Sequence, residues 1–168
     1  MRRTLAVIAM GLWLLPLVVA QEPPPPPPAA LTAETEVARV IEEVNAFYRE
    51  YWKAWDERDV KTIADGLDPE FVSYVYAPGR GVMQANREAS LEGVRQFMDS
   101  VRARQTLWNR SLLTVVPRSA TEVTAAVRSD FSVVDTRIGE IEVTVEVLRR
   151  GADGRWRLLR KWSERQPF

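Results

Sequence analysis

The sequence predicts an α+β fold, in which a curved antiparallel sheet wraps around one long helix and two shorter helices. Three observations lead to this prediction. Helical periodicity of apolar residues dominates before residue 101, and a two-residue period replaces it after residue 106. The later strands follow one another directly, which is typical of an antiparallel meander. The chain of 168 residues, 46% of them hydrophobic, is long enough for one well-packed domain.

The helices are predicted from apolar spacing and from residues that cap helix ends. A sustained stripe with steps of three and four residues predicts a helix over 33–57. Asp59 is a typical N-cap for a second, shorter helix over 60–67. Ser90 is a candidate N-cap for a third helix over 91–101. The stripe of the first helix consists of Val37, Val40, Ile41, Val44, Phe47, Tyr48, Tyr51, Trp52 and Trp55.

The strands are predicted from β-branched and aromatic residues that alternate with polar ones. An isolated β-rich segment covers 70–76, and four further strands cover 107–116, 123–133, 141–147 and 156–162. Turn residues separate them, among them the glycines around 151–154. The second and third helices argue against the main alternative, a cystatin-like fold with a single helix on a sheet.

Alternation also assigns residues to the two faces of the sheet. An apolar face that includes Val123 and Val133 is expected to cover the helices. The opposite face carries Arg128, Glu142, Thr144 and Glu146, and is expected to meet solvent or a dimer partner.

The first 32 residues have the composition of a targeting segment followed by a linker. The apolar run Leu5–Ala20 follows two arginines, which is typical of a secretory signal peptide over 1–20. An uncleaved anchor helix is the alternative, although a bilayer span needs roughly 20 apolar residues. Residues 21–32 form a proline-rich linker, in which unbroken prolines favour polyproline II. We therefore expect a periplasmic or secreted protein with no stable membrane insertion after cleavage.

The composition excludes several kinds of chemistry. The sequence has no cysteine and no histidine, which excludes disulfides, Ser-His-Asp triads and imidazole-ligated zinc. Its 23 basic and 23 acidic residues leave no charge excess for binding nucleic acid. It has neither a glycine-rich phosphate loop nor a metal-binding spacing, so we expect no cofactor and no metal. Acid–base chemistry would have to use Asp, Glu, Tyr or Lys.

Several stretches together resemble the nuclear transport factor 2-like superfamily, which includes ketosteroid isomerases and SnoaL-like polyketide cyclases. The resemblance covers about residues 34–166 and implies one domain over 33–168. It implies a conical pocket between the helices and the concave face of the sheet, and a convex face that often pairs two subunits. The stretches are YWKAWDERD at 51–59, DPEFV at 68–72, EGVRQF at 92–97 and GRWRLL at 154–159.

The resemblance also allows a test for catalytic residues. Ketosteroid isomerases use a carboxylate base with a tyrosine and a protonated aspartate as oxyanion donors. The resemblance places the tyrosine at Tyr51, the base at Val75, and the second donor near Val145 or Glu146. Val75 cannot move a proton, which argues against that reaction. The cyclases use a carboxylate on a pocket-facing strand position, for which Asp130 is the best match.

The candidate catalytic residues are therefore Tyr51, Asp130 and Glu146, each with an alternative interpretation. Core packing explains Tyr51 better than a role in a site does, and strict alternation directs Asp130 and Glu146 away from the pocket. Aromatic residues are expected to line the pocket. This predicted set comprises Tyr48, Tyr51, Trp55, Tyr76, Phe97, Trp108 and Trp162.

These observations leave three functions open. The first is binding of a small hydrophobic or aromatic ligand in the pocket. The second is an isomerase, cyclase or dehydratase that uses Asp, Glu or Tyr as acid and base. The third is a homodimeric interaction module, paired through the sheet, whose pocket is vestigial.

Overall fold

The computed structural model describes residues 34–167. The predicted signal peptide and the proline-rich linker lie outside the described residues. Within the described range, no helix is long and apolar enough to cross a membrane. The elements follow in the order α1 (Glu34–Glu57), α2 (Val60–Asp65), β1 (Leu67–Ala77), β2 (Gly81–Asn86), α3 (Arg87–Ser100), β3 (Thr106–Pro117), β4 (Glu122–Val133), β5 (Gly139–Arg150) and β6 (Trp156–Pro167).

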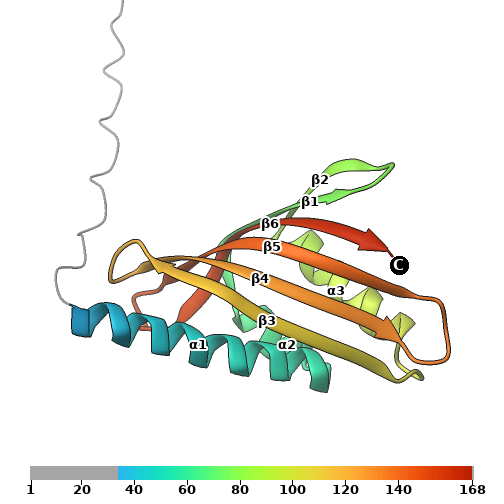
Figure 1. The fold of residues 1–168 in the computed structure, drawn as a ribbon, viewed down its shortest axis with the longest axis horizontal. Helices are drawn as coiled ribbons and strands as arrows, with labels where there is room; N and C mark the ends of the chain where they lie inside the picture. The colour runs from blue at the N-terminus through green and yellow to red at the C-terminus, as the bar shows by residue number, and fades with distance from the viewer. Residues whose placement is uncertain (1–33, 168) are drawn as a thin grey trace, which may run out of the picture.

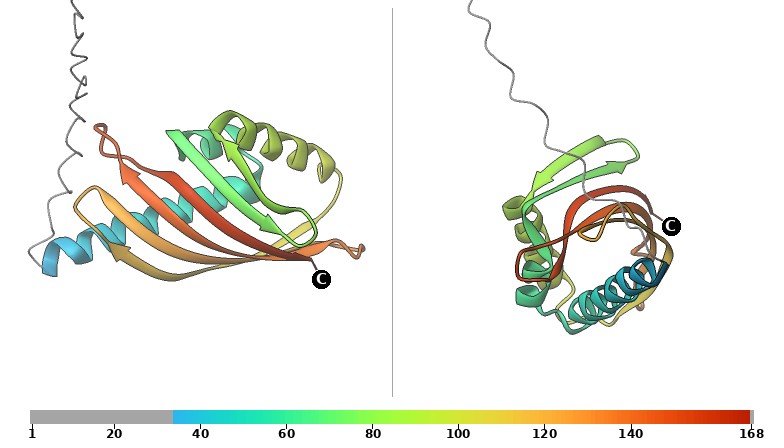
Figure 2. Two further views of the ribbon diagram at one scale, coloured as in Figure 1. Left: turned by 90° about the horizontal axis from the view of Figure 1, so that it is seen from above. Right: turned by 90° about the vertical axis from the view of Figure 1, so that its left-hand side faces the viewer.

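The strands form one curved sheet in the order β2-β1-β6-β5-β4-β3, and α1 runs along it (Figure 1). Seen end-on, the sheet curls so far that it closes most of a ring together with the helices (Figure 2). The predicted α+β class is confirmed. The prediction of a wholly antiparallel sheet is wrong at one pair, because β1 and β6 run parallel. The chain passes through β2, α3 and three more strands before β6, so no tight hairpin forces these two strands to be antiparallel.

The predicted long helix is confirmed as α1, and its apolar stripe packs against the sheet. Val40, Val44 and Tyr48 are buried on this stripe. They share a core cluster with Leu148 of β5 and Leu158 of β6. Burying this stripe supplies the hydrophobic stabilisation that holds the helix on the sheet.

The chain turns sharply between α1 and α2. Arg58 has a φ of 59°, a left-handed conformation that ends the first helix. The side chain of Asp59 then accepts a hydrogen bond of 3.1 Å from the backbone N–H of Thr62, so the predicted N-cap is confirmed. The second helix ends at Asp65, earlier than predicted, because Leu67 already begins β1.

The sequence prediction missed β2 and misplaced the start of α3. Gly79 and Gly81 have positive φ, and they allow the tight turn that pairs β2 with β1. Most of β2 is exposed, so it lacks the alternation by which strands are identified. Asn86, rather than Ser90, caps α3 by accepting a hydrogen bond of 3.0 Å from the N–H of Ala89.

The faces of β4 follow the prediction, whereas those of β5 are reversed. Ala125 of β4 is buried, and β5 pairs with it through Glu146. Paired residues lie on the same face of a sheet, so this register directs Glu146 inward. Thr144 is buried on that face too, whereas Val143 and Val145 are 47% and 45% exposed on the other. The prediction that the polar residues of this strand lie on the outer face, toward solvent or a dimer partner, is therefore wrong.

A β-bulge interrupts the alternation of β6. Leu158 pairs with Leu148, but the neighbouring Val147 pairs with Arg160, so one extra residue is inserted in β6. A bulge of this kind changes which face the following residues point to. Lys161 consequently lies on the inner face, while Trp162 is 43% exposed on the outer face.

Candidate functional site

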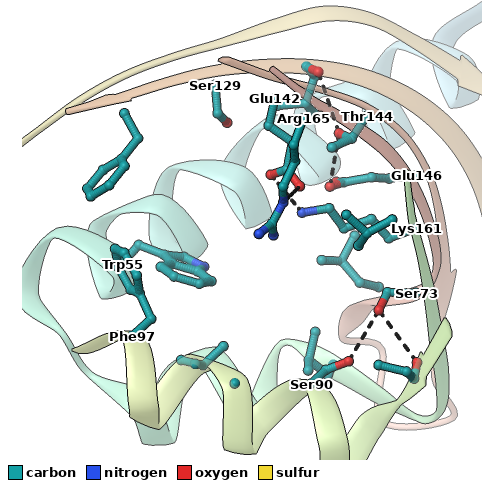
Figure 3. A pocket seen from close by; sticks show the side chains of 18 of the residues that line it. Trp55, Ser73, Ser90, Phe97, Ser129, Glu142, Thr144, Glu146, Lys161 and Arg165 are labelled. Atoms are coloured by element: carbon teal, nitrogen blue, oxygen red, sulfur yellow. Dashed lines mark hydrogen bonds and ion pairs between the residues drawn. The ribbon is translucent and has the colours of Figure 1, made fainter. Parts of the chain in front are cut away.

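A cavity of about 450 Å³ lies between the concave face of the sheet and the helices (Figure 3). Residues from α1, α3 and all six strands line it, so it is built by the fold as a whole. Its lining consists of Tyr51, Trp52, Trp55, Leu67, Phe71, Ser73, Val75, Met83, Ala85, Ala89, Ser90, Gly93, Val94, Phe97, Trp108, Arg110, Val127, Ser129, Phe131, Glu140, Glu142, Thr144, Glu146, Leu158, Lys161 and Arg165.

One side of the cavity is an aromatic wall, formed by Trp55, Phe97, Trp108 and Phe131. The ring centroids of Trp108 and Phe131 are 4.4 Å apart, and those of Phe97 and Phe131 are 5.2 Å apart. Trp55 of α1 closes the group, with its ring 5.9 Å from that of Trp108. Because these rings pack on one another, they present a continuous apolar surface to the cavity.

The sheet contributes a charged wall, formed by Glu142, Glu146, Lys161 and Arg165 (Figure 3). The carboxylate of Glu142 accepts hydrogen bonds from Lys161 Nζ and from Arg165 Nε, both at 3.0 Å. Burial alone would raise the pKa of Glu142, but the two adjacent cations outweigh burial and lower this pKa to about 2. Glu142 is therefore ionised and shared by two cations.

Glu146 is the buried acid of the charged wall. Its Oε2 accepts a hydrogen bond of 2.6 Å from the hydroxyl of Tyr48, and its Oε1 accepts one of 3.2 Å from Thr144. Burial raises the pKa of Glu146, against the opposing influence of the Lys161 charge. Burial also raises the pKa of Tyr48 well above its ordinary value, so Tyr48 remains a hydrogen-bond donor. Glu146 is thus a carboxyl group with a raised pKa that two hydroxyl groups hold in place at the edge of the cavity.

Arg110 of β3 connects the aromatic wall with α1. Its guanidinium lies 4.2 Å from the ring centroid of Trp108. Its Nη1 donates to Asp56 Oδ1 at 2.8 Å and to the backbone oxygen of Trp52 at 3.4 Å. The side chain is only 7% exposed, and Nη2 is buried without a hydrogen-bond partner in the described part of the chain.

The structure brings together part of the predicted aromatic set. Tyr51, Trp55, Phe97 and Trp108 line the cavity. Tyr48 does not line the cavity, but its hydroxyl donates a hydrogen bond to Glu146, which does. Contact of these aromatic residues with a ligand remains a prediction.

Two of the predicted aromatic residues lie elsewhere. Tyr76 is 45% exposed, and both Tyr76 and Trp162 line a shallow hollow on the outer face of the sheet. The bulge in β6 explains this position for Trp162.

The candidate catalytic residues are divided between the two faces. Tyr51 and Glu146 line the cavity, and Glu146 does so against the alternation that directed it outward. Asp130 lies outside the cavity and pairs with Arg128 at 3.0 Å, as alternation predicted. Val75, where the resemblance placed the base of ketosteroid isomerases, lines the cavity as an apolar residue.

Sequence reasoning missed Arg110, Glu142, Lys161 and Arg165 as cavity residues. The charge pattern of β5 and β6 contained a usable signal, because Glu142 pairs with Arg165 and Glu146 pairs with Lys161 across the two strands. Charged residues that pair across strands at alternate positions share a face. Identifying that face as the inner one needs the bulge, which the sequence does not reveal.

No group of three or more metal-binding side chains is found within residues 34–167. A comparison of the sequence with protein-family models finds no match, and a comparison with curated proteins finds none either.

Solved structures do resemble this one. An NTF-2 like protein of unknown function from Silicibacter pomeroyi matches with a TM-score of 0.62 and 14% identity, over 77% of this chain and 98% of that one. A ketosteroid isomerase-like protein from Erwinia carotovora atroseptica matches with a TM-score of 0.56 and 16% identity, over 79% and 98%. A protein from Catenulispora acidiphila, in complex with S-DNPA, matches with a TM-score of 0.57 and 24% identity, over 76% and 94%. The helix order, the curved six-stranded sheet and these likenesses show that the chain has the nuclear transport factor 2-like, ketosteroid isomerase-like fold.

Proposed function

We propose that the protein binds a small hydrophobic or aromatic molecule in the cavity. The observation that carries this proposal is the aromatic wall, which presents apolar surface inside a cavity of about 450 Å³. That volume lies within the range of about 300–1,000 Å³ that is usual for small-molecule sites. The S-DNPA complex of the Catenulispora acidiphila protein supports the proposal, because that protein of similar fold holds a ligand.

Calorimetric titration with 2-naphthylmethanol, a neutral bicyclic aromatic, tests this proposal. Trp108→Ala removes part of the aromatic wall and is expected to weaken binding by about tenfold, since aromatic contacts contribute about 0.5–1.5 kcal/mol beyond their area burial. Trp162→Ala on the outer face is the matched control and should bind like the wild type. No binding, or a loss caused by Trp162→Ala but not by Trp108→Ala, would refute the proposal.

A second candidate function is proton transfer, and Glu146 favours it. A carboxyl group whose pKa is raised by burial, and which Tyr48 and Thr144 position at the cavity, suits the role of general acid or base. The reaction class would be proton abstraction beside a carbonyl. Deuterium exchange at the α-carbons of 2-tetralone in D₂O, followed by NMR, tests it. The wild type should accelerate exchange and Glu146→Gln should not, whereas equal exchange rates would exclude the role.

We also propose that two copies pair through the outer face of the sheet. Apolar side chains there remain 43–69% exposed, and the stacked rings of Tyr74 and Trp162 lie among them, with centroids 6.0 Å apart. Exposed apolar patches of this kind mark protein contacts. Light scattering after size exclusion should give a dimer for the wild type and a monomer for Val145→Glu. A monomeric wild type would end this proposal. The patch consists of Tyr76, Val82, Val143, Val145 and Trp162.

Export through a signal peptide over residues 1–20 remains a proposal as well. Expression in a bacterium, followed by mass spectrometry of the purified protein, tests it. Cleavage is expected to leave Gln21 as the first residue. A protein that starts at Met1 and stays with the membrane fraction would favour an uncleaved anchor.

A further inference from the structure

An unpaired cationic donor lies beside the aromatic wall. The Arg110 side chain lines the cavity and is 7% exposed, yet its Nη2 has no hydrogen-bond partner within residues 34–167. A buried N–H without an acceptor costs free energy, and a charged one costs more than a neutral one. The contact with Trp108 and the hydrogen bond to Asp56 hold the guanidinium in place, so it cannot turn freely to find another acceptor.

The surroundings of Arg110 favour an anionic partner. Asp56 is the acid that pairs with it, and Asp56 is 55% exposed, on the solvent side. On the cavity side, Ser129 is the cross-strand partner of Arg110, and its side chain also lines the cavity (Figure 3). A hydroxyl can donate to a carboxylate beside a guanidinium, whereas it cannot neutralise the guanidinium charge.

The acids of the charged wall do not supply the missing partner. Glu142 already accepts from both Lys161 and Arg165. Glu146 accepts from Tyr48 and Thr144. Within the described residues, both carboxyl groups of the charged wall therefore accept hydrogen bonds from other side chains, whereas Nη2 of Arg110 has no acceptor.

We propose that the ligand of this cavity is an aromatic carboxylate, whose ring lies against the aromatic wall and whose carboxylate accepts hydrogen bonds from Arg110. This inference rests on the proposed binding function and adds the charge and orientation of the ligand. Nη2 of Arg110 carries the unpaired N–H groups, and a charge-assisted hydrogen bond from a guanidinium to a carboxylate gives direction as well as affinity. To reach the covered Nη2, the carboxylate must displace neighbouring side chains slightly, and such rotamer changes are common on binding.

Three probes of equal ring size test the inference by calorimetry: 2-naphthoate, 2-naphthylmethanol and 2-naphthylmethylammonium. The wild type should bind the naphthoate about tenfold or more tightly than the alcohol, as expected for hydrogen bonds to a charged group. It should bind the ammonium compound most weakly. Arg110→Met should remove the advantage of the naphthoate over the alcohol, so that the two probes bind this variant with similar affinity. Arg128→Met, on the outer face of the adjacent strand, is the matched control and should keep the advantage.

The alternative outcomes separate this inference from the proposed function. If the alcohol or the ammonium compound binds as tightly as the naphthoate, the cavity binds aromatic molecules but the preference for an anion is refuted. If the preference survives Arg110→Met and disappears in Lys161→Met, the carboxylate lies at the charged wall and the assignment to Arg110 is wrong. If no probe binds, the inference and the proposed function both fail. Arg110→Lys keeps the positive charge but lacks the planar guanidinium, so it should retain part of the advantage of the naphthoate. This variant replaces Arg110→Met in the test if Arg110→Met does not fold.

Discussion

Replacing Gly66 with alanine should destabilise the fold and disturb the cavity at the same time. Gly66 follows α2 and has an ordinary helical φ of −78°, so its backbone conformation would accept alanine. However, there is no room for a side chain at this position. An added Cβ would lie 2.7 Å from Cδ2 of Tyr51 and 2.9 Å from its Cε2.

The loss of stability can be estimated because neither the Tyr51 ring nor the Gly66 backbone can move far. The distance of 2.7 Å is about 0.7 Å short of the 3.4 Å at which ordinary contact begins. The Tyr51 ring is stacked on Phe47 with centroids 5.4 Å apart, and the carbonyl of Gly66 accepts a hydrogen bond from the backbone N–H of Leu158. Overpacking of this kind costs about 1–3 kcal/mol. For a domain of this size, that corresponds to a decrease in Tm of roughly 3–15 °C.

Urea unfolding followed by circular dichroism measures this effect. Gly93→Ala is the matched control, because a Cβ at that helical glycine meets no atom within 4 Å. It should stabilise the protein by about 0.5–1 kcal/mol. Tyr51→Leu removes the clashing ring, so Gly66→Ala should cost much less in that background. If Gly66→Ala unfolds at the same urea concentration as the wild type, or costs as much in the Tyr51→Leu background as it does beside the native tyrosine, the steric argument is refuted.

Two further predictions concern pH. Because the pKa of Glu142 is lowered to about 2, its stabilisation is present above its ordinary value of 4.5 and is lost as the pH falls toward 2. In Glu142→Gln, the free energy of unfolding should therefore fall less than in the wild type between pH 4.5 and pH 2. Urea titrations that give the same pH dependence for both proteins would contradict this. The pKa of Glu146 is raised, so its stabilisation is present below 4.5 and is lost as the pH rises through the folded-state pKa. The difference in unfolding free energy between Glu146→Gln and the wild type should therefore favour the variant more at pH 7 than at pH 4. A difference that does not change with pH would refute this prediction.

Much of the fold could be predicted because local patterns and tertiary packing agree. The stripe of α1 and the cap at Asp59 are both local signals that the structure keeps. The strand β2 could not be predicted in this way, because it is mostly exposed and therefore carries no alternation. The parallel pairing of β1 with β6 joins segments far apart in the chain, and no local pattern encodes that contact.

The site was harder to predict than the fold because its residues break the rules that predict folds. Polar residues are normally assigned to the solvent face, yet Glu146 is buried at the cavity. Lys161 and Trp162 exchange faces because a single bulge in β6 shifts the alternation. Tyr51, Trp55, Phe97 and Trp108 were predictable as cavity residues because large aromatic side chains on inward positions obey the ordinary rule.

The reversed faces of β5 have a consequence for folding. If this strand slipped by one residue against its neighbours, Val143 and Val145 would turn inward and the glutamates would turn to water. Judged by hydrophobic burial alone, the slipped pairing would compete with the native one. Other contacts must therefore help to select the native pairing. It buries Leu148 and pairs Glu142 with Lys161 and Arg165 of β6. In the turn at 151–154, the backbone N–H of Gly151 donates to the oxygen of Arg155, which also favours this register. The strand that keeps the cavity polar thus makes this hairpin a point where misfolding can begin.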